Sequence, residues 1–277
     1  MVTRRIFLKS AALAAGLTGA ASTVTPAGAA QGAAQNPASQ AKPQYYELRK
    51  FQLRNGYQPE RTNEFFSKHF MPAAKQAGLG PIGVFGPLLP GFGTADRSPF
   101  LLFLLTHSSF AAAENAWDRI MTGPSMAAAY GEWHKTLEPG FVRSETSVLR
   151  AFTAHPQLRV PPATPRNHIF ELRMYESNNE KTLRRKIEMF NGGEMQIFQR
   201  LGMLTVFFGE TLVGSSLPNL TYMLAYKDLA TRESLWKAFE ADPEFVKLRT
   251  RPGLSDAEIV ANISSAFLGP APYSDIR

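Results

Sequence analysis

A glutamate and an arginine stand two residues apart in two short stretches of this 277-residue chain, and these charged pairs are its best candidates for chemistry. The first pair is Glu47 and Arg49, and the second is Glu171 and Arg173. Side chains two positions apart on a β-strand point to the same face. Either arginine could hold an anionic or carbonyl group of a ligand. The alternative is that both pairs are ion pairs that fix how two parts of the fold meet.

Three further residues are candidate general bases, acting with Arg49 or Arg173 as the electrophilic partner. Glu194 interrupts an apolar helical stripe, where burial would raise the pKa of its carboxyl group and suit it to accept a proton. The glycines before Glu194 favour the alternative, in which the helix breaks and turns this side chain to solvent. His69 and His107 are the other two candidates.

Aromatic side chains accompany the charged pairs. Tyr175 shares a strand face with Glu171 and Arg173, and Tyr222 and Tyr226 share one face of a later strand. These rings could line an apolar cavity between two halves of the fold, although such a stripe is more often plain core. The candidate binding residues are therefore Glu47, Arg49, Glu171, Arg173, Tyr175, Tyr222 and Tyr226.

The sequence predicts no metal site and no cofactor. The chain has no cysteine, and its five histidines lack the short spacings of a zinc site. It contains no GxGxxG motif after a strand, no P-loop and no GxSxG nucleophile motif. Nucleotide binding, thiol catalysis and serine-hydrolase chemistry are therefore not indicated.

The sequence pattern of the elements that must position these residues occurs twice in the chain, as an internal repeat. The strand pattern of residues 46–51 returns at 170–175, and Trp117 is matched by Trp236. Each copy reads strand, helix, strand, strand, helix, strand, which is the order of a ferredoxin-like unit. One such unit leaves a sheet face uncovered. We therefore predict an α+β fold in which two tandem units close into an intrachain, pseudo-dimeric α/β barrel. The polar face with the Glu–Arg pairs should then point into the barrel, and the apolar face should pack on the helices.

The first unit is predicted at residues 45–152 and the second at 168–270. Four prolines fall in the segment 153–167 between them, which we interpret as a semi-rigid linker without helix or central strand. His155 lies in this linker and is expected to be exposed to solvent.

Residues 1–34 have the pattern of an export signal and its leader. Arg4 and Arg5 lie in the stretch TRRIFLK, which resembles the twin-arginine signal of bacteria and precedes a mild apolar run too short to span a membrane. We therefore expect export by the twin-arginine translocase to the periplasm or the cell exterior. Removing this segment lowers the formal net charge of +7, which argues against a nucleic-acid partner.

The residues of both copies resemble the NIPSNAP family. The shared features are Glu-Leu-Arg-x-aromatic opening a strand, a helix that ends in glycine, and an apolar strand leading to a Trp-bearing helix. The second copy, with FELRMY at 170–175 and Trp236, is the better match, since Phe51 replaces the tyrosine in the first. The resemblance covers roughly residues 45–270 and implies the dimeric α/β-barrel superfamily. That superfamily also holds cofactor-free monooxygenases and haem-degrading enzymes, so the resemblance implies a fold rather than a reaction.

Two classes of function stay open from the sequence. The first is a binding or accessory module that holds a small, partly apolar or anionic molecule, or a partner protein. The second is a cofactor-independent enzyme, like a monooxygenase or an isomerase, with its site between sheet and helices. An arginine and a base that converge on a cavity of about 300 Å³ or more would favour a small-molecule site, and hence the enzyme. The sequence names no substrate and does not decide whether chains also pair into homo-oligomers.

Overall fold

The computed structural model describes residues 41–88, 98–135, 137 and 139–277. The predicted export signal, with Arg4 and Arg5, lies outside these residues. No helix in the described ranges has the length and apolar character needed to cross a membrane.

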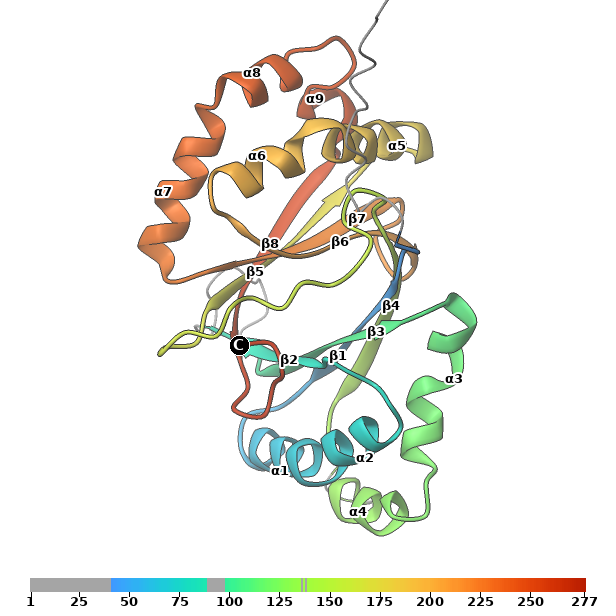
Figure 1. Cartoon of the computed structure of the whole chain (residues 1–277). Coiled ribbons are helices and arrows are strands. Elements are labelled where there is room, and N and C mark those ends of the chain that lie inside the picture. Colours follow the sequence, from blue (N-terminus) through green and yellow to red (C-terminus); the bar gives the residue numbers. More distant parts are fainter. Residues whose placement is uncertain (1–40, 89–97, 136, 138) are drawn as a thin grey trace, which may run out of the picture. The chain divides into compact units, whose positions relative to one another are not determined.

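The described strands form one closed antiparallel barrel in the order β1-β3-β2-β8-β5-β7-β6-β4 (Figure 1). Within each half the strands follow the ferredoxin-like order, and the halves join through the pairs β2–β8 and β4–β6. The predicted α+β fold, in which one chain closes its own barrel, is therefore confirmed. The strands are β1 (Tyr45–Gln52), β2 (Gly83–Pro87), β3 (Phe100–His107), β4 (Arg143–Ala151), β5 (Ile169–Glu176), β6 (Leu204–Val213), β7 (Asn219–Tyr226) and β8 (Asn262–Pro270).

The helices of each half cover the outside of that half's own strands, so the barrel lies between two helical layers (Figure 1). The single helix predicted after each first strand contains a π-helical turn, and it ends before Gly78 or Gly202, where φ is positive. The first half has α1 (Tyr57–Phe65), the π-turn η2 (Phe66–Phe70), α2 (Met71–Gln76), α3 (Phe110–Met121) and α4 (Met126–Trp133). The second has α5 (Glu180–Met189), the π-turn η3 (Phe190–Glu194), α6 (Met195–Arg200), α7 (Leu229–Glu240), α8 (Pro243–Arg249) and α9 (Asp256–Ile259).

The helices that face the Glu–Arg pairs begin at equivalent positions of the two halves. The side chain of Ser109 accepts a hydrogen bond from the Ala112 amide at the start of α3. Asp228 does the same for the Thr231 amide at the start of α7. Such caps satisfy amides that the first helical turn leaves unpaired, so both helices start at a defined residue. Trp117 and Trp236 therefore occupy equivalent positions in the two helices, counted from their caps.

The two faces of the first strand of each half are the reverse of those predicted. Tyr46 and Phe170 point into the barrel, where they belong to an apolar cluster from both halves. Glu171 and Tyr175 lie on the outer face, under the helices. The residues around Tyr46 and Phe170 are an apolar cluster, in which a carboxylate would be costly, whereas the outer face of β5 offers Glu171 donors from α7. The prediction that the polar face points inward is wrong for this reason.

One end of the barrel is covered by two chain segments that follow the last strand of each half. In the linker, the Arg159 amide donates to the carbonyl of Val206, and Leu158 packs against the lumen cluster. In the C-terminal tail, the Asp275 amide donates to the carbonyl of Ile82, and Ile276 is completely buried. The linker contains no helix or strand over residues 153–167, as its prolines predict. It does more than connect the halves, because it closes the barrel.

His155 in this linker is completely buried, so the expectation that it is exposed is wrong. Its Nε2 lies 3.2 Å from Thr205 Oγ1, and its Nδ1 has no hydrogen-bond partner in the structure. Burial, with a smaller contribution from the charge of Arg159, lowers the pKa of His155 to about 4. The imidazole is therefore neutral in the folded protein at neutral pH.

This burial predicts a loss of stability on acidification. An unfolded histidine has a pKa near 6.5, so the unfolded chain binds more protons than the folded protein between that pH and the folded pKa of about 4. The contribution of His155 is complete above about pH 6.5 and decreases by about 3 kcal/mol as the pH falls to about 4. Urea unfolding at pH 7, 6 and 5 measures this slope, which should be shallower in His155→Gln. Parallel slopes in the two proteins would contradict the prediction.

Candidate functional site

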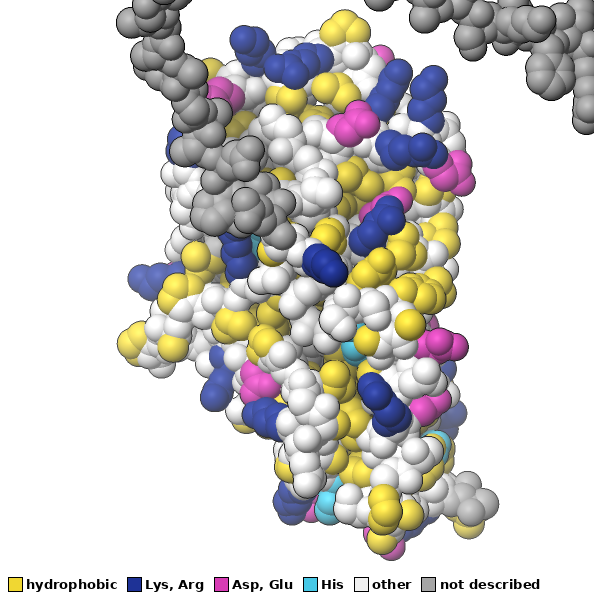
Figure 2. Space-filling model, turned by 45° about the vertical axis from the view of Figure 1, so that its right-hand side comes forward, with side chains coloured by type: hydrophobic (Ala, Val, Ile, Leu, Met, Phe, Trp, Pro, Cys, Tyr) yellow, Lys and Arg dark blue, Asp and Glu magenta, His cyan; other side chains and the backbone are white. Residues whose placement is uncertain are grey.

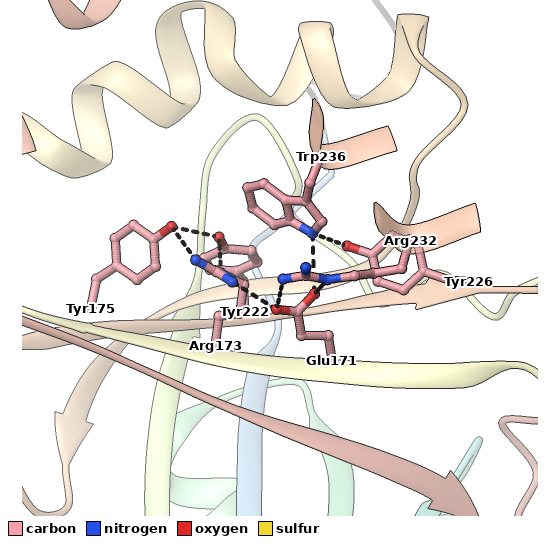
Figure 3. A network of polar contacts seen from close by, with 7 residues as sticks. All are labelled: Glu171, Arg173, Tyr175, Tyr222, Tyr226, Arg232 and Trp236. Atoms are coloured by element: carbon pink, nitrogen blue, oxygen red, sulfur yellow. Dashed lines mark hydrogen bonds and ion pairs between the residues drawn. The ribbon is translucent and has the colours of Figure 1, made fainter. Parts of the chain in front are cut away.

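Glu171 is the centre of a polar network between β5 and α7 (Figure 3). Its side chain has no exposed surface, and its Oε1 accepts from Arg173 Nη1 at 2.7 Å and from Arg232 Nη2 at 2.8 Å. Its Oε2 accepts from Arg232 Nε at 3.0 Å and from Trp236 Nε1 at 3.1 Å. Burial alone would raise the pKa of Glu171, but the hydrogen bond from Arg232 and the charge of Arg173 hold it below its usual range. The ionised carboxylate fastens α7 to the sheet.

Arg173 has a protein partner at each guanidinium nitrogen. Besides its contact with Glu171, its Nε donates to Tyr222 Oη at 3.0 Å and its Nη2 to Tyr175 Oη at 3.2 Å. The two tyrosines are bonded to each other at 3.0 Å, and the guanidinium lies 4.4 Å from the centre of the Trp236 ring. Trp236 Nε1 also donates to Tyr226 Oη at 2.8 Å. The polar groups around Arg173 are thus bonded to one another rather than left for a ligand.

The first half has the same core pair with fewer partners. Glu47 Oε1 accepts from Arg49 Nε and Nη2, both at 2.9 Å, and Glu47 Oε2 lies 3.0 Å from His107 Nε2. The Arg49 guanidinium lies 4.2 Å from the centre of the Trp117 ring. Arg49 and Trp117 therefore repeat the stacking of Arg173 on Trp236, and His107 replaces Tyr226.

The hydroxyl groups that surround Arg173 are missing around Arg49. Phe103 is the cross-strand neighbour of Arg49, as Tyr222 is of Arg173, and Phe51 stands where the second half has Tyr175. In the part of the chain that the structure describes, Glu47 is the sole hydrogen-bond acceptor of Arg49, which leaves Nη1 without a partner. The Arg49 side chain is 22% exposed, against 13% for Arg173.

A cavity of about 390 Å³ lies beside Arg49, between the outer face of β1 and helices α3 and α4. A guanidinium with free donors among aromatic walls is suited to a flat, mostly apolar molecule that carries a carboxylate or carbonyl oxygen. Asp118, on the exposed side of α3, is the acidic side chain of the lining. The lining residues are Arg49, Phe51, Trp117, Asp118, Met121, Thr122, Tyr130, Trp133, Phe141 and Ser144.

The three candidate bases do not line this cavity. His107 is buried against Glu47. His69 lies in a separate surface depression of about 280 Å³ with Glu64 and Glu132. In the described ranges, no group of three or more His, Asp or Glu side chains has the arrangement of a metal site. The structure therefore brings Arg49 together with aromatic rings but not with a proton acceptor from that set.

Glu194 is 2% exposed, so the expectation that a helix break turns it to solvent is wrong. The break is the π-turn η3, in which Gly193 leaves helical geometry while Glu194 stays on the buried side. Burial raises the pKa of Glu194 even though the ammonium of Lys186, 3.4 Å away, opposes the shift. Lys186 is itself 1% exposed and lies 3.1 Å from Asp256 Oδ1. These carboxylates outweigh the effect of burial and raise the pKa of Lys186.

Two residues of these networks were missed from the sequence, although each left a signal. Lys186 falls within the apolar stripe of its helix, three residues after Leu183, which is an unusual place for a lysine. Arg232 stands one helical turn before Trp236 and therefore shares its face.

Residues 170–275 match the family model for NIPSNAP, and no curated protein matches the chain. A proposed monooxygenase from Fusobacterium nucleatum is similar in structure, with a TM-score of 0.53 and 8% identity over 83% of this chain and 93% of that one. A second, from Lactobacillus acidophilus, has a TM-score of 0.52 and 10% identity over 83% and 94%. An uncharacterised NIPSNAP-like domain protein from Burkholderia xenovorans matches 39% of this chain and 89% of its own, with a TM-score of 0.35 and 18% identity. At these identities the first two matches establish a shared fold.

Proposed function

Since residues 170–275 are a NIPSNAP-family domain, closed into one barrel with a first half of the same topology, we propose that this protein is a small-molecule-binding module whose ligand lies on Arg49. The observation that carries the proposal is the difference between two equivalent arginines. Arg173 is engaged at every nitrogen, whereas Arg49 keeps a free Nη1 beside an aromatic cavity of about 390 Å³. The ligand class is a flat, mostly apolar molecule with a carboxylate or carbonyl oxygen.

The geometry supports binding more than catalysis. A general base must reach the proton that it removes, directly or through one water. Glu194, His69 and His107 do not line the Arg49 cavity, and Glu194 and His107 are already held by Lys186 and Glu47. Asp118, the carboxylate of the lining, lies on the exposed side of α3, where water solvates it as it does an ordinary surface carboxylate. The likeness to two proposed monooxygenases is one of fold. A cofactor-independent enzyme is therefore the weaker alternative.

We further propose that the module acts outside the cytoplasm. The stretch TRRIFLK at residues 3–9 supports export by the twin-arginine translocase to the periplasm or the cell exterior. Figure 2 shows one face on which basic and acidic side chains are interspersed, without a continuous basic strip. That face therefore gives no support to a nucleic-acid partner.

A matched pair of substitutions tests the assignment to Arg49. Benzoate, a flat aromatic carboxylate, should bind the protein without its signal segment, as measured by calorimetric titration. Arg49→Lys keeps the ion pair with Glu47 but loses the guanidinium fork, and should weaken benzoate binding about tenfold. Arg173→Lys, the same change at the equivalent position, should leave the affinity for benzoate unchanged.

The double variant Phe51→Tyr/Phe103→Tyr is the sharper test. It gives Arg49 the two hydroxyl groups that engage Arg173 and should abolish the benzoate signal by occupying the free donors. Equal benzoate affinities in the wild-type protein, Arg49→Lys and this double variant would overturn the proposal.

A further inference from the structure

A second cavity of about 390 Å³ lies inside the barrel, on the other face of β1 from Arg49. It opens at the end of the barrel opposite to the linker and the C-terminal tail, since Lys50, Glu145 and Met174 lie toward that end of their strands. Met174 and Leu172 are half-buried although they point inward, because the cavity gives solvent access to the lumen.

The cavity exists because two of the residues in the middle layer of the lumen, Ser147 and Ala266, are small. Its floor is aromatic, where the ring centres of Tyr46 and Phe207 are 5.0 Å apart and those of Phe85 and Phe170 are 4.8 Å apart. In the next layer, Leu48 is paired with Ser147, and the equivalent Leu172 is paired with Ala266. A serine and an alanine cannot fill the space between two leucines, so the lumen stays open above the floor.

Thr211, Thr221 and Asn219 form a bonded polar cluster at one side of this cavity. The hydroxyl groups of Thr211 and Thr221 donate to Asn219 Oδ1, and Asn219 Nδ2 donates to the carbonyl groups of Ser215 and Ser216. An apolar wall of Leu48, Leu102, Leu172, Met174 and Ala266 faces this cluster.

The mouth carries charge on one side only. Lys50 lies where the second half has Met174, and Glu145 lies where it has Ser264. Glu145 is engaged by Arg143, whose Nε is 3.2 Å from Oε1. The ammonium of Lys50 lies 5.0 Å from the centre of the Phe100 ring, and no ion pair to Lys50 is present among the described residues. The mouth therefore offers a cation that has no ion pair among the described residues, although Glu145 is its cross-strand neighbour, above a chamber with an apolar wall.

We propose that the lumen is a second binding site, which takes a medium-chain carboxylate with its carboxylate on Lys50 and its chain between the leucines. At about 30 Å³ per water-sized group, the cavity holds roughly a dozen non-hydrogen atoms, which is the size of octanoate. A cation beside an apolar chamber selects a chain with an anionic head over a neutral or cationic one. The site shares no lining residue with the Arg49 cavity, so it stands or fails independently of the function proposed above.

Calorimetric titration of the protein without its signal segment with octanoate, 1-octanol and octylammonium tests this site. Octanoate should bind most tightly and octylammonium least. Lys50→Met gives the mouth the same side chain as its equivalent, and should weaken octanoate about fivefold while leaving 1-octanol unchanged. Met174→Lys adds a second cation at the mouth and should tighten octanoate binding.

Ala266→Leu fills the middle of the chamber and should abolish binding of both octanoate and 1-octanol. Ser147→Leu, its counterpart in the other half, provides the same block if Ala266→Leu does not fold. The proposal is overturned if octanoate does not bind, if Lys50→Met leaves its affinity unchanged, or if the folded leucine variant still binds it.

Discussion

Glu171→Gln is expected to lower the free energy of unfolding by about 3–5 kcal/mol. The carboxylate accepts from two arginines and an indole, and each of its oxygens has two donors. A glutamine amide can replace one oxygen, but its NH₂ group would then point at N–H donors that cannot accept. Two guanidinium groups would also lose their buried counter-charge. Urea unfolding at pH 7 measures the loss.

Glu47→Gln is the matched control, and we expect it to cost only about 1 kcal/mol. Its Oε1 faces Arg49, so the amide oxygen can accept there. Its Oε2 faces His107 Nε2, which in one tautomer accepts a hydrogen bond from the new NH₂ group. Equal losses at the two positions would show that the donors around Glu171 do not set its contribution.

Lys186→Met should cost about 3 kcal/mol, because it leaves Glu194 buried without its counter-charge. The carboxyl group would take up a proton, since burial already raises its pKa. The equivalent positions of the first half, Thr62 and Phe70, hold no charge and are equally buried. The pair is therefore not required by the fold itself.

The double variant Lys186→Met/Glu194→Leu should regain most of the stability that Lys186→Met loses. Replacing both members of a buried ion pair by apolar groups removes both desolvation penalties, and Asp256 stays half-exposed and solvated. Urea unfolding of the wild type, both single variants and the double variant completes the cycle. Additive losses, with the double variant less stable than either single variant, would contradict this expectation.

The fold could be predicted from the sequence because it is encoded twice. The strand that opens with Glu-Leu-Arg and the helix that carries tryptophan recur in the same order, and a ferredoxin-like unit needs a partner for its open face. Which face turns inward could not be read from β1 or β5. The alternation of side chains separates the two faces of a strand but does not tell them apart here, because both are buried. One face packs inside the barrel and the other packs under the helices. The donors that Glu171 meets on the outer face of β5 come from Arg232 and Trp236, which lie far along the chain from it.

The candidate site was predicted only as a pair of equivalent arginines. The sequence already contains the difference between them, since Phe51 and Phe103 stand where the second half has Tyr175 and Tyr222. The sequence does not show that this difference matters for binding, because only the structure shows that both tyrosine hydroxyl groups accept hydrogen bonds from Arg173. Glu194 was misplaced for a similar reason. Two glycines indicate that a helix deviates, but they do not say that a π-turn will keep the next side chain buried.

The closure of the barrel within one chain has a consequence for how its sites can change. In an assembly of two identical subunits, every substitution appears twice, so a pocket cannot be altered without altering its twin. Here the two halves are inherited as separate stretches of sequence. The second half could keep the network around Glu171 that holds α7 on the sheet, while the first half lost the hydroxyl groups around Arg49. Such a protein would bind one molecule per barrel at this arginine, where a symmetric ancestor would bind two.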